Sequence, residues 1–100
     1  MNVTINQQDN LVKVTLSGRA DTTNADRFQT DITPLLNLEK PDIEIDCSEM
    51  EYTSSQGLRV FLMLQKSVNA HGGKMVLRNM KPQVKEVFDI TGFSNIINIL

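Results

Sequence analysis

The sequence is poor in the residues that bind metal ions or form cross-links. Cys47 is the only cysteine and His71 the only histidine among 100 residues. A disulfide within the chain is therefore excluded, and one thiol with one imidazole cannot supply the usual ligand set of a zinc site. We predict no metal ion and no other cofactor.

Glycines and basic clusters are scarce as well. The five glycines never fall in the spacing of the glycine-rich loops that bind nucleotide phosphates, which excludes nucleotide binding through such loops. The formal net charge is −2, and no run of lysines and arginines is present. Binding to nucleic acid phosphates needs clustered positive charge, so we expect no direct contact with nucleic acid.

Long hydrophobic runs are absent too. The longest extends from Val60 to Leu64, which is too short to cross a bilayer, and the first residues lack the basic head and apolar stretch of a secretory signal. We therefore expect a cytoplasmic protein without a membrane span. The length and the 40% hydrophobic content are those of a single domain, residues 1–100, with little room for a deep substrate pocket.

Hydrophobic periodicity predicts several short strands. Residues 2–7 and 11–17 alternate apolar and polar side chains on either side of a polar turn, which predicts an antiparallel hairpin. Further strands are predicted at 41–46, at 74–78 and, as a short strand or an apolar cap, at 96–100.

Helices alternate with these strands. Apolar residues three and four apart predict a helix that is capped by Thr23 and loses its regularity near Thr33, because Pro34 follows. Two further helices are predicted over 55–70 and from Pro82 to Gly92. The fold class is therefore α/β: a small mixed sheet of about four to five strands, with an N-terminal antiparallel hairpin, then parallel βαβ units, and helices packed on it.

Catalytic machinery is not visible. A nucleophile needs a base within hydrogen-bonding reach, and His71 would lie roughly 24 Å from Ser55, at the opposite end of the same helix. Cys47 has no partner in the sequence and is expected to be a partly buried small side chain. We predict that the chain is not an enzyme; turnover abolished by changing Cys47 or Ser55 would be evidence to the contrary.

Carboxylates are concentrated in one stretch, with no lysine or arginine between Pro41 and Leu58. They are Asp42, Glu44, Asp46, Glu49 and Glu51. Strand alternation sends the first three to one face. Two interpretations stay open: an ordinary solvated face, or an acidic docking surface for a basic partner.

Two serines stand at the start of the strongest helix, after a strand that is predicted to end at Asp46 and a polar loop. The first N–H groups of a helix have no intrahelical partner, so Ser54 or Ser55 can act as an N-cap worth about 1 kcal/mol. The same position tolerates a phosphate, and phosphorylation would add about −1.5 to −2 charges that repel a docking partner without rearranging the fold.

Several stretches carry a family resemblance. They are Leu16–Asp21 with Asn24-Ala25, Ile45–Ser48 with Tyr52, Ser54–Arg59, Gly72–Met75, and Val84–Phe88 with Thr91–Phe93. In this order they resemble the STAS domain, which is the domain of anti-sigma factor antagonists (anti-anti-sigma factors) and of sulfate-transporter tails. The resemblance covers essentially the whole chain, and its expected fold agrees with the one predicted from periodicity.

The resemblance implies a phosphorylation switch. In the antagonist branch, a kinase that is also an anti-sigma factor phosphorylates one serine at this helix start. The unmodified form binds that kinase and frees the sigma factor, and a serine phosphatase reverses the modification. By motif position Ser55 is the acceptor. Ser54 stands where many antagonists have Asp, and Gln56 where another Ser often follows, so Ser54 is the alternative acceptor.

The resemblance also implies a partner-binding surface. Its residues are Asp21, Thr22, Asn24, Asp46, Ser48, Thr53, Ser54, Ser55, Gln56, Gly57 and Arg59. A second interpretation stays open: an unswitched STAS adaptor subunit of a transport or signalling complex, whose partner binding would not depend on Ser55.

Overall fold

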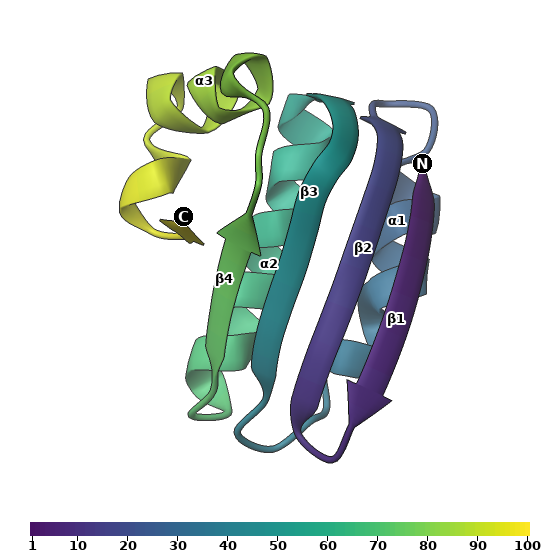
Figure 1. Cartoon of the computed structure of the whole chain (residues 1–100), viewed down its shortest axis with the longest axis vertical. Helices are drawn as coiled ribbons and strands as arrows, with labels where there is room; N and C mark the ends of the chain where they lie inside the picture. Colours follow the sequence, from purple (N-terminus) through teal and green to yellow (C-terminus); the bar gives the residue numbers. More distant parts are fainter.

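A single mixed sheet forms the framework of the computed structural model, which describes residues 1–100. Its strands, in the spatial order of the sheet, are β1 (Asn2–Gln8), β2 (Leu11–Ala20), β3 (Asp42–Thr53), β4 (Lys74–Arg78) and β5 (Asn98–Ile99). β1 and β2 are antiparallel and every other neighbouring pair is parallel (Figure 1). The predicted mixed sheet, with its N-terminal hairpin and parallel units, is confirmed.

The helices connect the parallel strands. They are α1 (Ala25–Ile32), α2 (Ser55–Ala70) and α3 (Pro82–Ile90), with short 3₁₀ turns at Thr33–Leu35 and Phe93–Asn95. Because the strands follow one another in chain order, right-handed crossovers carry the connecting helices to the same side of the sheet. α1 and α2 lie behind the sheet in Figure 1, and α3 lies near the end of β4. None of the helices has the length and apolar character needed to cross a membrane.

The core fills the space between the sheet and the helices. Alternate residues of the central strands point into it, among them Val14 of β2 and Ile45 of β3, which are at most 1% exposed. Phe61 of α2 lies at the centre, with its ring centroid 5.2 Å from that of Phe28 in α1 and 5.5 Å from that of Phe88 in α3. Both pairs are edge-to-face, a favourable arrangement for aromatic rings. One aromatic residue thus joins all three helices.

β3 is longer than the sequence predicted, and the prediction that a strand ends at Asp46 and a polar loop follows is wrong. The strand continues to Thr53 because β2 is also long and pairs with it as far as Ala20. Register shifts between Thr15 and Ser17, and between Gly18 and Arg19, interrupt the simple alternation. Backbone pairing with β2 holds this polar segment in the sheet, which side-chain polarity alone did not indicate.

The predicted start of the first helix also needs correction. α1 begins at Ala25, its N-cap position is Asn24, and Thr23 does not cap it. The Thr23 hydroxyl donates instead to the carboxylate of Asp21. The regular helix ends at Ile32 and becomes 3₁₀ at Thr33, as expected from the following proline.

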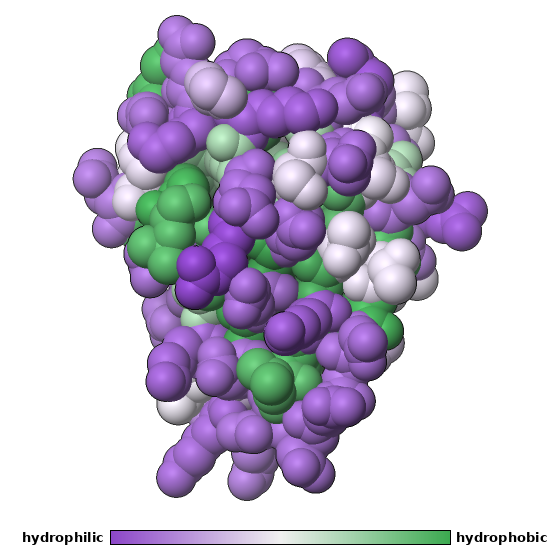
Figure 2. All heavy atoms as spheres, viewed as in Figure 1, coloured by the Kyte–Doolittle hydropathy of each residue, from purple (hydrophilic) through white to green (hydrophobic).

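Ile43, Ile45 and Cys47 of β3 are buried, so the alternating Asp42, Glu44 and Asp46 lie on the opposite face of the sheet. No helix covers this face in Figure 1. Figure 2 shows this face as mostly hydrophilic, with a hydrophobic patch beside the C terminus. Glu44 forms an ion pair with Arg78 of β4 at 2.9 Å, and Lys13 of β2 lies beside Glu44 on the other side. Because neighbouring strands supply positive charge, the arrangement favours a solvated face over an acidic docking surface.

Candidate functional site

Ser54 joins the end of the sheet to the start of α2. It is the single residue between β3 and the helix, and its Oγ accepts a hydrogen bond from the N–H of Gly57 at 3.3 Å. Its own N–H donates to the carbonyl oxygen of Ala20 at 2.8 Å. Ser54 is therefore the N-cap of α2, and it ties the helix start to the end of β2.

Ser55 differs from its neighbour in what its hydroxyl contacts. It is the first residue of α2 and is exposed, and its Oγ donates to the side-chain carbonyl oxygen of Gln56 at 3.0 Å. No backbone group occupies this hydroxyl. Of the two candidate serines, Ser55 presents its oxygen to solvent, whereas the Ser54 oxygen is engaged in capping the helix.

The helix start packs closely against the strands beneath it. A Cβ at Gly57 would stand 2.7 Å from Oγ1 of Thr53 and 2.9 Å from the carbonyl oxygen of Ala20. Only glycine permits this approach. Thr53 and Gly57 are both buried, so these two predicted partner-binding residues support the site from below and do not form its surface.

The turn between β2 and α1 is a closed hydrogen-bond network. The side-chain amide of Asn24 donates to the carbonyl oxygen of Arg19 at 2.7 Å and accepts from the N–H of Asp21 at 3.0 Å. Hydrogen bonds from the hydroxyl and the N–H of Thr23 lower the pKa of the Asp21 carboxyl, with a further contribution from the charge of Arg19. The exposed Thr22 lies in the same turn. Because Ala20 also binds Ser54, this ordered turn borders the start of α2.

An arginine and a tyrosine that were not among the predicted site residues complete this edge. The guanidinium of Arg19 lies 4.3 Å from the centre of the Tyr52 ring and 3.7 Å from Asp21. The contact is a cation–π interaction between neighbouring strands. It follows from the pairing of Arg19 with Tyr52 after two register shifts, which no local sequence signal indicates.

Asp46 and Ser48 lie apart from the other predicted site residues. The Ser48 N–H donates to the Asp46 carboxylate at 3.0 Å, and this bond is the main cause of the lowered pKa of Asp46. Six strand steps separate Ser48 from Ser54, roughly 20 Å at the usual rise of a strand. The structure therefore does not bring Asp46 and Ser48 to the helix start, because the predicted loop is part of β3.

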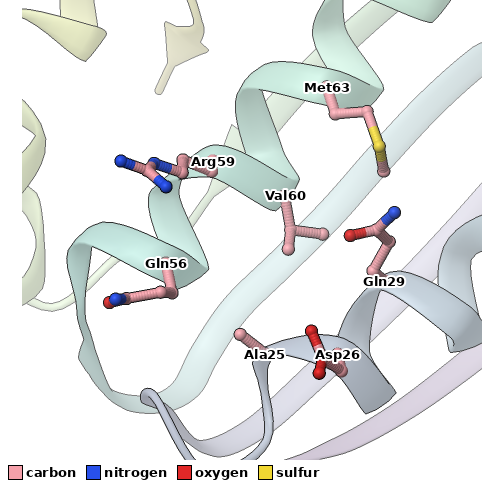
Figure 3. Close-up of a pocket in the computed structure, with 7 residues that line it drawn as sticks. All are labelled: Ala25, Asp26, Gln29, Gln56, Arg59, Val60 and Met63. Carbon is pink, nitrogen blue, oxygen red and sulfur yellow. The ribbon is translucent and has the colours of Figure 1, made fainter.

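A shallow groove between α1 and α2 adjoins Ser55. Its volume is about 380 Å³. It is lined by Ala25, Asp26, Gln29, Gln56, Arg59, Val60 and Met63 (Figure 3). Gln56 and Arg59 were predicted from the sequence. The other five were not, because their proximity depends on how the two helices pack against each other.

Neither the single cysteine nor the single histidine is placed for catalysis. Cys47 is fully buried, not partly buried as expected, and burial raises the pKa of its thiol to about 12. His71 is the C-cap of α2, and its Nδ1 lies 2.7 Å from the carbonyl oxygen of Ser67. It therefore stands at the opposite end of the helix from Ser55.

Known proteins share this sequence pattern and fold. A profile of the STAS domain family matches residues 2–100. The anti-sigma-B factor antagonist of Bacillus subtilis is 32% identical over 99 residues, which cover 99% of this chain and 90% of that protein.

Solved structures share the fold at lower sequence identity. An anti-sigma-factor antagonist (STAS) domain protein from Planctomyces limnophilus superposes with a TM-score of 0.85 at 13% identity, over 98% of this chain and 87% of that one. The Bacillus protein SpoIIAA superposes over 99% of this chain at 16% identity. Its unphosphorylated form gives a TM-score of 0.74 over 87% of that chain, and its phosphorylated form 0.73 over 91%.

Proposed function

The chain belongs to the STAS domain family, and from that premise we propose that it is an anti-sigma factor antagonist. Its partner is an anti-sigma factor that is also a serine kinase, and phosphorylation of Ser55 switches the binding off. The observation that carries the proposal is the exposed Ser55 hydroxyl at the first position of α2. The 32% identity to an anti-sigma-B factor antagonist supports it.

The proposed modification is an ordinary phosphoryl transfer. The Oγ of Ser55 attacks the γ-phosphorus of ATP, the bond to the β-phosphate breaks, and ADP leaves. The hydroxyl proton passes to a base of the kinase. A serine phosphatase reverses the modification by transferring the phosphoryl group to water. The phosphate adds about −1.5 to −2 charges at an exposed position, so the domain keeps its fold.

The docking surface that we propose consists of parts that are already ordered. It combines the start of α2, the hydrogen-bonded turn after β2 and the groove between α1 and α2. A preformed surface loses little conformational freedom on binding. A phosphate at its centre places charge and bulk where the partner docks. The protein then acts in the cytoplasm by binding and regulates transcription indirectly, without contacting nucleic acid.

Calorimetric binding to a cognate kinase tests this proposal. We expect the unmodified protein to bind and the Ser55-phosphorylated protein to bind at least about 100-fold more weakly, because the added charge is buried against the partner. Lys66→Glu, an exposed change of two charge units further along α2, is the matched control and should bind normally. Equal affinity with and without the phosphate would identify an unswitched adaptor instead.

A further inference from the structure

Arg59 is the one arginine of the chain without a carboxylate partner. Arg19 pairs with Asp21 at 3.7 Å, Arg27 with Asp31 at 3.9 Å, and Arg78 with Glu44 at 2.9 Å. Arg59 is exposed near the start of α2 and forms no ion pair. Its guanidinium group is therefore free to bind an anion that is introduced nearby.

Its position on α2 directs it toward Ser55. The two residues are four apart in the helix, so their Cβ atoms lie on one face, about 5–6 Å apart. Side chains of a helix lean toward its N-terminus, which carries the Arg59 guanidinium over the first turn. Figure 3 shows this guanidinium extending on the same side of α2 as the amide of Gln56. That amide accepts the hydrogen bond from the Ser55 hydroxyl.

We propose that Arg59 binds the phosphate of Ser55 in the modified protein. The inference rests on the proposed function and adds the residue that receives the phosphate. A guanidinium group donates two parallel N–H bonds to phosphate oxygens, and an arginine four residues from the phosphoserine reaches them without a change in the backbone.

The proposed contact also changes the groove between α1 and α2. Asp26 and Arg59 are the charged residues of its lining, and they form no ion pair with each other. When the phosphate binds Arg59, the positive charge at this edge of the groove is neutralised. A partner whose acidic side chain binds Arg59 in the unmodified protein then loses that ion pair. The same partner is also repelled by the phosphate.

Neither Arg19 nor Lys66 is placed to compete with Arg59 for the phosphate. Arg19 is held between Asp21 and the Tyr52 ring. Lys66, the next positive residue on α2, is eleven residues from Ser55, roughly 16 Å along the axis. We therefore expect replacement of Arg59 to change the second ionisation of the phosphate more than replacement of Arg19 or Lys66.

The test uses protein with phosphoserine incorporated at position 55 during translation, so that no kinase is needed. Phosphorus NMR follows the second ionisation of the phosphate. We expect the midpoint in the wild-type background to lie roughly 0.2–0.4 pH units below that of Arg59→Gln, the size of an exposed ion pair at this spacing. Arg59→Lys should restore only part of the shift, because the ammonium group keeps the charge but not the two parallel N–H bonds.

The controls separate a local contact from net charge. Lys66→Gln removes one positive charge from the same helix and should leave the midpoint unchanged. The first N–H groups of α2 act on the phosphate equally in every variant. Equal midpoints in wild type and Arg59→Gln, or an equal rise in Lys66→Gln, would overturn the inference. Failure of a kinase to modify Ser55 would contradict the proposed function. It would not affect this NMR measurement, in which no kinase is used.

Discussion

At the scale of single residues, the two adjacent serines have separate roles. Ser54 satisfies a backbone N–H that the helix cannot pair internally, and it also binds β2. The Ser55 hydroxyl contacts one neighbouring side chain and is otherwise exposed. The position at the helix start allowed either residue to be the N-cap, and the family resemblance implied Ser55 as the acceptor with Ser54 as the alternative. The extended backbone of Ser54 assigns it the capping role, and Ser55 remains the residue that we propose is modified.

These different contacts predict that removal of the two hydroxyl groups lowers the free energy of unfolding by different amounts. Ser54→Ala should lower the free energy of unfolding by about 1 kcal/mol, because the Gly57 N–H loses its partner. Ser55→Ala should change it by less than about 0.5 kcal/mol, as expected for an exposed site. Urea unfolding of both variants measures the difference. Equal destabilisation by the two changes would argue against the assignment of the cap.

The carboxyl of Asp46 gives a prediction about pH. Its native pKa is lowered, chiefly by the Ser48 N–H and then by the Ser48 and Asn79 side chains. A lowered native pKa means that the contribution to stability is present above the unfolded value, about 3.9, and is lost as pH falls through the native value.

Asp46→Asn keeps an oxygen that accepts from Ser48 but does not titrate. Its stability should therefore fall less steeply than that of the wild type as pH decreases below about 4. Thermal unfolding at a series of pH values measures both slopes. If both proteins lost stability equally as the pH decreases below about 4, a contribution of this carboxyl to the pH dependence of stability would be excluded.

At the scale of elements, a helix or strand was predicted correctly where the residues that determine it lie close together in the sequence. The bounds of α2 were predicted correctly because a polar start, a regular apolar face and two following glycines all lie within the segment. The second half of β3 was missed because its partner, β2, lies far away in sequence and is shifted in register. The Arg19–Tyr52 contact was missed for the same reason. The groove was missed because it depends on the packing of two helices.

The contact between α2 and the strand ends yields a prediction of its own. Gly57→Ala places a Cβ 2.9 Å from a backbone oxygen that is fixed in β2, so the helix start must shift. We expect a loss of about 1–3 kcal/mol in the free energy of unfolding, although alanine favours helices. Gln56→Ala, an exposed change in the same turn, is the control and should have little effect. A Gly57→Ala variant that is more stable than the wild type would show that the helix start has room for a Cβ next to β2.

At the scale of the whole molecule, the proposed interface lies at one end of the sheet. β2 and β3 run in parallel and end side by side, and each is followed directly by the turn or helix that carries site residues. Loops at the carboxyl ends of parallel strands commonly carry binding sites. In the proposed function, a phosphate on Ser55 therefore acts directly at the docking surface, and its effect does not require any change in the aromatic core that joins the helices.

Whether Ser55 is the switch can be tested by measuring the mass of the protein after incubation with a cognate serine kinase and ATP, and by mapping the modified residue. We expect one phosphate on Ser55, absent from Ser55→Ala and retained in Ser54→Ala. A phosphate on Ser54, or none while the kinase binds stably, would contradict this expectation.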